Sequence, residues 1–134
     1  MIVYRWIDHT AELELEIEAG SEESVFEDAL AAVGELLGER AGEGRGPATH
    51  RVAASAPDRA TLLAEWLSEL AYLAETEGFV PEAASRLELA GNSLEATVAG
   101  RLASPPHLIK AVTYHRLGMW EESGAWRARI IFDV

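Results

Sequence analysis

The chain has 134 residues, 49% of them hydrophobic, with 23 acidic side chains against 11 lysines and arginines and no cysteine. This length most simply gives one domain over residues 1–134, and the lack of cysteine excludes disulfides, thiolate metal ligands and cysteine nucleophiles. The net charge of −12 repels phosphate backbones, so direct binding to nucleic acid is not expected, and cations and basic protein surfaces are the natural partners.

No apolar run approaches the roughly 20 residues of a membrane span. The opening residues, Met-Ile-Val-Tyr-Arg-Trp, lack the basic region, apolar core and cleavage site of a signal peptide. A cytoplasmic protein without membrane contact is therefore expected. The sequence leaves its oligomeric state open.

The N-terminal region predicts a strand. A short β-prone segment over residues 2–7 is followed by Asp8-His9-Thr10, residue types that favour turns or bulges. From Glu12 to Glu18, glutamate alternates with leucine or isoleucine, and this period of two predicts a strand with one buried and one solvent-exposed face. The apolar side chains should lie in the core, and all four glutamates in solvent.

Two amphipathic helices are predicted next. Ser21 is the expected N-cap of the first, which should end near Gly38. Its apolar stripe follows helical spacing and consists of Phe26, Leu30, Val33 and Leu37. The second helix should open after Pro57-Asp58 and end at Gly78. Its stripe comprises Leu63, Trp66, Leu67, Leu70 and Leu73 or Ala74.

The remaining segments predict strands and loops. Residues 38–48 are glycine-rich and predict a flexible loop, and residues 49–56 are a weak strand candidate. The later predicted strands are 85–90, 94–102, a strand that starts at Leu108, and 126–134 after a turn at 121–124. This order predicts an α+β fold, a two-layer sandwich with both helices on one face of a mixed, mostly antiparallel sheet.

A pairing between the two ends of the chain would build a candidate site. If the strands 12–18 and 126–134 pair antiparallel, Arg127 and Arg129 face the row of glutamates. The same register brings Asp133 and the terminal carboxylate of Val134 toward Glu12. Carboxylate oxygens are the ligands that Ca²⁺ and Mg²⁺ prefer, so these three residues are candidate ligands of a hard cation.

Other polar residues carry weaker signals. His9 or His115 could serve in proton transfer, although a lone histidine in a strand or turn is more often structural. Lys110 is the only lysine in the chain, and a single ammonium in an acidic domain could brace a carboxylate cluster or reach into a partner. GxSxG, Walker and GxGxxG motifs are all missing, so the signatures of serine hydrolases and nucleotide-binding folds are missing too.

Two motifs together resemble the archease family. They are Asp8-His9-Thr10-Ala11-Glu12 and Lys110-Ala111-Val112-Thr113-Tyr114-His115, with Phe132-Asp133-Val134 ending the chain. The intervening pattern agrees, in Phe26–Leu30, Leu62–Leu70 and Thr76–Gly78, so the resemblance covers essentially the whole chain. It implies an archease-like fold and a small, acidic, cytosolic protein without catalytic activity of its own.

The resemblance also implies a partner and a site. Archeases assist the RNA-splicing ligase that joins 2′,3′-cyclic-phosphate or 3′-phosphate ends to 5′-hydroxyl ends, and they promote guanylylation of that ligase by GTP and multiple turnover. Mapped onto this chain, the family's calcium site implies Glu12, Asp133 and Val134 as ligands. Glutamate stands at position 12 where the family usually carries aspartate, and its extra methylene changes the reach of the carboxylate. The residues implied in activation of the partner are Lys110, His9, Asp8 and His115.

Two alternatives come from other functional classes. A stand-alone metal-dependent hydrolase would use Glu12 and Asp133 with His9, and it would need an enclosed pocket. A general chaperone or adaptor would bind unfolded clients without any role for a metal or for Asp133.

Overall fold

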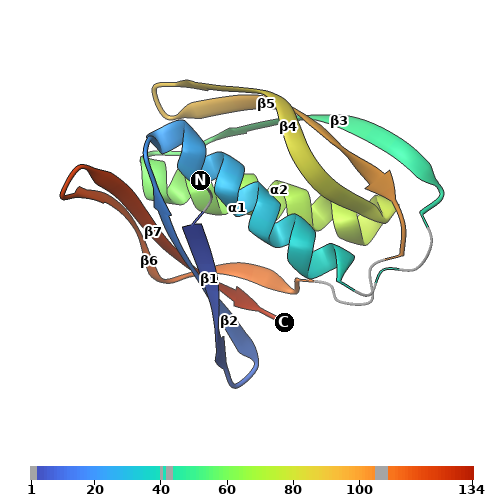
Figure 1. Cartoon of the computed structure of the whole chain (residues 1–134), viewed down its shortest axis with the longest axis horizontal. Coiled ribbons are helices and arrows are strands. Elements are labelled where there is room, and N and C mark those ends of the chain that lie inside the picture. The colour runs from blue at the N-terminus through green and yellow to red at the C-terminus, as the bar shows by residue number, and fades with distance from the viewer. Residues whose placement is uncertain (1–2, 40, 42–43, 105–108) are drawn as a thin grey trace.

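The computed structural model describes residues 3–39, 41, 44–104 and 109–134. Figure 1 shows the order of the elements along the chain. They are β1 (Val3–His9), β2 (Glu12–Ala19), α1 (Glu22–Gly38), β3 (Gly46–Ser55), α2 (Arg59–Glu77), β4 (Phe79–Ala90), β5 (Ser93–Leu102), β6 (Ala111–Glu122) and β7 (Ala125–Asp133).

The strands form two sheets with the helices between them (Figure 1). Sheet A has the order β1-β2-β7-β6 and sheet B the order β3-β5-β4, and every neighbouring pair is antiparallel. The predicted α+β class, with two helices packed on antiparallel strands, is confirmed. The strands are divided between two sheets, however, and do not form the single sheet that the sequence led us to expect.

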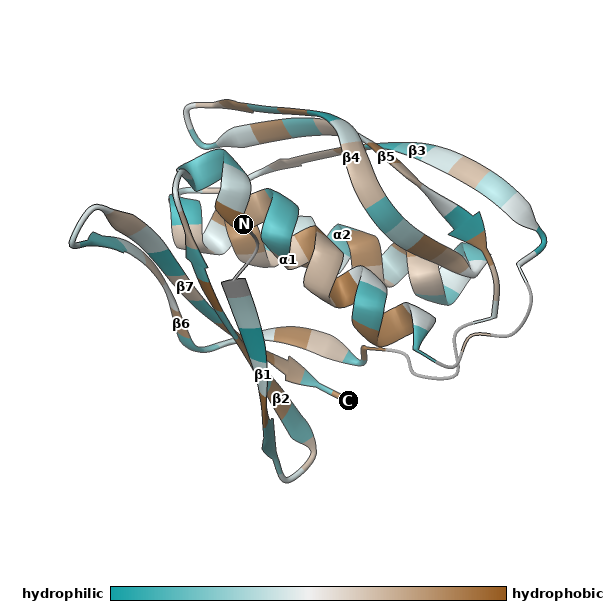
Figure 2. Ribbon diagram, in the orientation of Figure 1, coloured by the Kyte–Doolittle hydropathy of each residue, from teal (hydrophilic) through white to brown (hydrophobic). Residues whose placement is uncertain are grey.

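Burial on two sides of the helices explains the second sheet. α1 packs against β4 of sheet B and β2 of sheet A, and α2 packs against β3 and β6. Figure 2 shows hydrophobic residues along both helices. The buried positions of α1 extend well beyond the predicted stripe and are Val25, Phe26, Asp28, Ala29, Leu30, Ala32, Val33, Gly34 and Leu37. A helix buried over so much of its surface needs a cover on more than one side.

The ends of the helices follow the predicted signals. Ser21 caps α1 by accepting a hydrogen bond from the backbone N of Ser24 at 3.2 Å, and Asp58 caps α2 in the same way with Thr61 at 2.8 Å. Gly78 ends α2 in the left-handed conformation, with φ +69°. Between the helices, the Trp66 indole donates a hydrogen bond to the Phe26 carbonyl at 3.0 Å. Of the helices described, none is both long and apolar enough to cross a membrane.

Several predicted boundaries move in the structure. The segment before Asp8 is a full strand, β1, which pairs with β2 through a turn at Thr10-Ala11. β3 begins at Gly46, so the loop predicted over 38–48 is shorter than expected, and residues 40 and 42–43 of it lie outside the described residues. The predicted start of a strand at Leu108 also lies outside them, and β6 begins at Ala111.

The predicted register between β2 and β7 is confirmed. Glu18 is the partner of Arg127, and their side chains form an ion pair at 3.2 Å. Glu16 is the partner of Arg129 but binds Arg5 of β1 instead, at 2.6 Å. One expectation was wrong: Glu14 does not lie in solvent, because only 3% of its surface is exposed.

Candidate functional site

The predicted site residues gather at one end of sheet A. One row of cross-strand partners crosses all four strands there: His9, Glu12, Asp133 and Ala111. We call this end the sheet A tip and define it as residues 8–12, 110–111 and 133–134. Antiparallel pairing brings together motifs that are more than 100 residues apart in the sequence, as expected from their alternation.

Glu12 and Asp133 lie directly opposite each other on β2 and β7, and both are half-buried. Side chains opposite each other in an antiparallel pair share one face of the sheet, and two like charges in such a pair are destabilising. Within the described residues, no hydrogen bond or ion pair engages either carboxylate. A cation between the two would remove their repulsion.

Val134 completes the predicted set of ligands. Its backbone N–H donates to the carbonyl of Ala11 at 3.3 Å, which holds Val134 beside the turn that directly precedes Glu12. Among the described residues, no three side chains of Asp, Glu or His form a metal-binding group by themselves. The predicted set contains only two such side chains and an oxygen of Val134. Its three oxygen donors suit a hard cation, and the metal site stays a prediction.

Lys110 lies beside Asp133 through the backbone. Its N–H donates to the carbonyl of Asp133 at 2.8 Å, immediately before β6 begins. Its side chain is exposed, with no ion pair to any described residue. It borders a surface pocket of about 250 Å³ that also touches Tyr72 and Glu75 of α2. The ammonium is therefore free to contact a partner.

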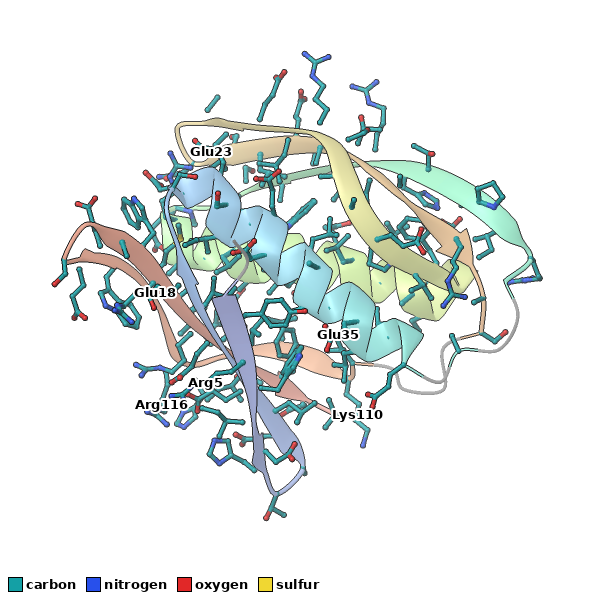
Figure 3. All side chains as sticks on the ribbon, viewed as in Figure 1. Arg5, Glu18, Glu23, Glu35, Lys110 and Arg116 are labelled. Atoms are coloured by element: carbon teal, nitrogen blue, oxygen red, sulfur yellow. The ribbon has the colours of Figure 1, made fainter. Side chains whose placement is uncertain are left out.

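On its inner side, the tip borders an open groove of about 680 Å³ between the β1–β2 hairpin and α1. The groove is also lined by His9; its apolar lining residues are Trp6, Leu13, Leu36, Ile109 and Val134, and the acidic ones are Asp8, Glu12, Glu35 and Glu39. Glu35, labelled in Figure 3, accepts a hydrogen bond from the hydroxyl of Tyr4. Burial and this carboxylate raise the pKa of Tyr4 to about 12. The groove suits a partner segment that is basic and partly apolar.

On its outer side, the tip borders a smaller pocket of about 210 Å³. Its lining residues are His9, Thr10, Glu12, His115, Arg116 and Ile131. His9 and His115 are thus brought to the same pocket from β1 and β6, while Asp8 lines only the inner groove. The sheet A tip therefore has an acidic inner side and an outer side rich in hydrogen-bond donors.

The sequence interpretation missed two charged residues at this outer pocket. Glu14 was placed in solvent, but it lies beneath His9 and Arg116, with its Oε1 3.1 Å from His9 Nε2 and 3.6 Å from Arg116 Nη1. Nothing in the alternation of β2 distinguishes Glu14 from its neighbours. Arg116 could have been noticed, because it directly follows the motif that ends at His115.

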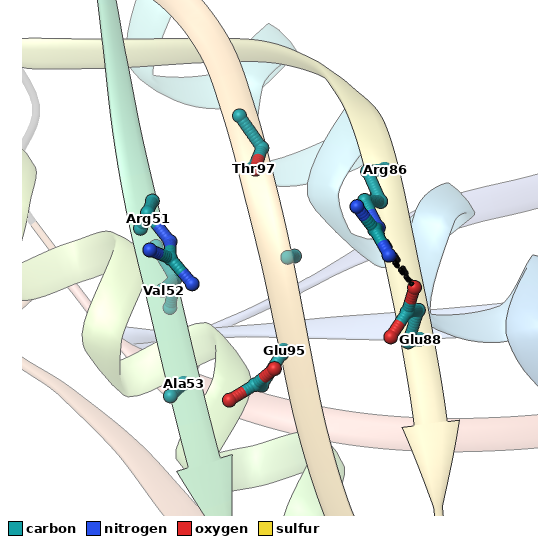
Figure 4. Close-up of a pocket in the computed structure, with 8 residues that line it drawn as sticks. Arg51, Val52, Ala53, Arg86, Glu88, Glu95 and Thr97 are labelled. Atoms are coloured by element: carbon teal, nitrogen blue, oxygen red, sulfur yellow. Dashed lines mark hydrogen bonds and ion pairs between the residues drawn. The ribbon is translucent and has the colours of Figure 1, made fainter.

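Another hollow, of about 620 Å³, lies on the outer face of sheet B and contains none of the predicted site residues (Figure 4). Arg51, Thr97 and Arg86 form one row of partners across its three strands. Two residues further along the strands, the next row on the same face contains Glu95 and Glu88, and Arg86 binds Glu88 at 2.5 Å. Acidic and basic side chains offset one another on this face, as on an ordinary solvent-exposed sheet.

Comparison with known sequences identifies relatives over nearly the whole chain. The model of the archease protein family (MTH1598/TM1083) matches residues 4–134. Protein archease of Methanosarcina mazei is 30% identical over 140 residues, which cover 98% of this chain and 95% of that protein. Protein archease of Methanothermobacter thermautotrophicus is 32% identical over 124 residues, or 84% of each chain.

Two solved structures share the fold. The solution structure of protein 1598 of Methanobacterium thermoautotrophicum has a TM-score of 0.69 and 24% identity, and the match covers 98% of both chains. The crystal structure of an archease from Thermotoga maritima, described as a possible chaperone, has a TM-score of 0.67 and 23% identity, covering 96% of this chain and 94% of that one. Both likenesses support the arrangement of two helices on antiparallel sheets.

Proposed function

This chain belongs to the archease family, and we propose that it is a non-catalytic activator of an RNA-splicing ligase. The partner ligase joins 2′,3′-cyclic-phosphate or 3′-phosphate RNA ends to 5′-hydroxyl ends in tRNA splicing and RNA repair. The activator promotes guanylylation of the ligase by GTP and lets each ligase molecule turn over repeatedly, in the cytoplasm.

The observation that carries this proposal is the meeting of both archease-like motifs at the sheet A tip. Lys110 donates its backbone N–H to Asp133, which is in turn the cross-strand partner of Glu12. The tip is open to solvent and bears an exposed Lys110 side chain. Such an end can be inserted into the active site of another protein, because Lys110 is exposed and Glu12 and Asp133 are only half-buried.

A divalent cation, which we expect to be Ca²⁺, would be held by Glu12, Asp133 and an oxygen of Val134. A cation bound there would supply positive charge next to the phosphates of the ligase's nucleotide. The residues of the chain position this charge, since phosphoryl-type chemistry depends mainly on placement and on charge stabilisation. Glu12 reaches further than the aspartate usual in the family, so the cation would lie further from β2.

Electrostatics supports docking on a basic surface. The chain carries a net charge of −12, and the described residues that line the groove beside the tip include four acidic side chains and neither lysine nor arginine. Complementary charge raises the rate of association and orients the two proteins. The same charge opposes direct binding of RNA by this chain, so the proposal assigns RNA to the ligase.

The stand-alone hydrolase is the less favoured alternative. Glu12 lines both the inner groove and the outer pocket, and both are open, whereas hydrolysis without a partner needs an enclosed site that excludes water from its intermediates. A general chaperone or adaptor is the second candidate, because the archease of T. maritima is described as a possible chaperone. It differs from the activator in needing neither Asp133 nor Lys110.

A multiple-turnover RNA-joining assay with limiting ligase of the same host tests the proposal. We expect Lys110→Ala to reduce the stimulation at least about tenfold, equivalent to ~1.4 kcal/mol, with no change in thermal unfolding. Arg51→Ala is the matched control, because Arg51 is another exposed cation without an ion pair to any described residue. Full stimulation by Lys110→Ala would contradict the role of the tip. Equal suppression of client aggregation by wild type and Asp133→Ala, without ligase stimulation, would support the chaperone.

A further inference from the structure

The outer pocket of the sheet A tip combines hydrogen-bond donors from three segments of the chain. Thr10 comes from the β1–β2 turn, His9 from β1, and His115 and Arg116 from β6. We propose that this pocket binds a single phosphate group of a small molecule. The inference rests on the proposed function only for the cation at Glu12, which also lines the pocket.

Glu14 contacts two side chains that line the pocket, those of His9 and Arg116, and positions these two donors. It is the buried acid of a strand face that otherwise bears half-buried glutamates, with 3% of its surface exposed. Its Oε1 lies 3.1 Å from His9 Nε2 and 3.6 Å from Arg116 Nη1. A buried carboxylate needs such partners, and by holding them it fixes both side chains at the wall of the pocket. Glu14 is therefore a positioning residue.

An irregularity in β6 brings His115 and Arg116 to this place. From Thr113 to Gly118, β6 advances five residues while its partner β7 advances two, from Ile131 to Arg129. The extra residues of β6 do not pair with β7, and a β-bulge of this kind changes the direction in which the side chains point. Arg116 has φ +56°, a left-handed conformation that non-glycine residues adopt rarely.

The bulge is fixed by contacts on both sides of the sheet. The carbonyl of Arg116 accepts a hydrogen bond from Arg129 Nε at 3.0 Å, and the backbone N–H of His115 donates to Thr113 Oγ1 at 3.3 Å. On the helix side, the hydroxyl of Tyr114 donates to Glu65 Oε1 of α2 at 2.8 Å. The donors are thus placed before any ligand arrives. Figure 3 shows Arg116 at the side of sheet A that faces away from the helices.

The donors match a phosphate in number and charge. Arg116 directs Nη1 toward Glu14, which leaves its other N–H groups to bind an anion, and Thr10 adds a hydroxyl. A guanidinium with free N–H groups is the side chain best suited to phosphate oxygens. Glu12 opposes an anion in the pocket, and a divalent cation on Glu12 would convert this repulsion into attraction. Phosphate and cation should therefore bind cooperatively.

The size of the pocket and the charge of the chain select the class of ligand. At about 210 Å³, the pocket is smaller than the roughly 300–1,000 Å³ of sites that enclose whole small molecules, so it suits one group of a ligand. A chain with net charge −12 repels a polyanionic RNA strand far more than one phosphate. We therefore assign the phosphate to a small molecule such as a nucleoside triphosphate or inorganic phosphate.

Titration of the folded protein with inorganic phosphate, followed by NMR, tests this inference. Samples contain either Mg²⁺ or EDTA, and the signals observed are the ring protons of His9 and His115 and the Nε–H of Arg116. We expect saturable shifts that are at least tenfold weaker in Arg116→Gln and at least threefold weaker in EDTA. Arg86→Gln should bind phosphate like wild type, because Arg86 is likewise exposed and paired with a glutamate, on sheet B.

Further ligands separate the possible sources of the phosphate. GTP should displace inorganic phosphate, whereas an oligoribonucleotide with a 3′-phosphate should bind no more tightly than its 3′-hydroxyl counterpart. Tighter binding of the 3′-phosphate oligonucleotide than of GTP would overturn the assignment to a small molecule. Chemical shifts that change linearly with phosphate concentration, without saturation, would overturn the phosphate pocket itself. So would a loss of phosphate affinity in Arg86→Gln as large as that in Arg116→Gln.

The inference and the proposed function can fail separately. Wild-type protein that stimulates the ligase but does not bind phosphate would refute the phosphate pocket alone. Saturable binding dependent on Arg116, in a protein that leaves the ligase unaffected, would refute the activator role and leave the pocket standing.

Discussion

Asp28 lies in α1 with 5% of its surface exposed, and its Oδ2 accepts no hydrogen bond from any described residue. Burial, reinforced by the neighbouring charge of Glu27, raises the pKa of Asp28 to about 6 from an ordinary value of 3.8. The folded state thus binds this proton more tightly than the unfolded state. The stability contributed by the protonated acid is present below pH 4 and is lost as the pH rises toward 6.

Removal of this charge should therefore stabilise the protein at neutral pH. We expect Asp28→Asn to raise the free energy of unfolding by about 1–2 kcal/mol at pH 7.5, an amount reduced from the full pKa shift for screening by solvent. Below pH 4 the gain should vanish. Urea denaturation at both pH values measures the difference, and Glu95→Gln on sheet B is the control. The same gain at both pH values would show that the Asp28 charge is not its cause.

At the site, some residues could be predicted from the sequence and others could not. Glu12 and Asp133 were paired correctly, because alternation determines which residues share a face and the pairing of Arg127 and Arg129 with glutamates favours this register. Glu14 could not be placed, because its burial depends on a bulge in β6 that contributes Arg116. The sequence pattern of β2 cannot reveal that Glu14 contacts β6, which lies two strands away in sheet A.

Among the elements, α1 makes a close backbone contact with sheet B at Gly34. A Cβ atom added at Gly34 would lie 2.1 Å from the carbonyl oxygen of Pro81 in β4. No real Cβ approaches a backbone atom so closely, so the helix or the strand would have to move. Glycine at this position is therefore required for the contact between α1 and sheet B.

Gly34→Ala tests this contact. Overpacking in a core costs about 1–3 kcal/mol, which outweighs the gain of roughly 1 kcal/mol from replacing glycine by alanine in a helix. Because the added Cβ would meet a backbone oxygen at 2.1 Å, the cost should lie in the upper part of this range, and we expect a net loss of up to about 2 kcal/mol in the free energy of unfolding. Gly20→Ala is the control, because a Cβ there would meet nothing within 4 Å. The account fails if urea denaturation shows Gly34→Ala to be as stable as wild type.

The helices and turns were more predictable than the layers. Ser21, Asp58 and Gly78 signal helix ends through local hydrogen bonds and backbone conformation, which a few residues determine. The division of the strands between two sheets is a property of long-range pairing. Alternating strands look alike whichever sheet they join, so the second sheet could not be predicted, and the broad burial of α1 that accompanies it is seen only in the structure.

At the scale of the whole molecule, the acidic inner groove and the donor-rich outer pocket lie on opposite sides of the sheet A tip. A basic partner should therefore approach the tip from the side of the acidic groove. Charges at the rim of an interface act mainly on the rate of association, and salt screens them over about 10 Å at 0.1 M.

Glu39→Lys should reveal this directionality. Glu39 is an exposed residue at the rim of the groove, and reversal of its charge should slow association with the ligase by about three- to tenfold at low salt, as expected for a rim charge. The effect should shrink at 0.5 M NaCl. Glu121→Lys, an exposed change in β6 away from the groove, serves as the control. Stopped-flow or biosensor rates equal to those of Glu121→Lys would contradict docking through this groove.

The most direct test of the activator role is covalent guanylylation of the host's RNA ligase by GTP at limiting divalent metal. The account predicts that wild-type protein accelerates formation of the guanylylated ligase, and that Asp133→Ala, folded as judged by thermal unfolding, does not. Equal acceleration by wild type and Asp133→Ala would contradict a role for the carboxylates of the sheet A tip. No acceleration by wild type would contradict the activator function itself.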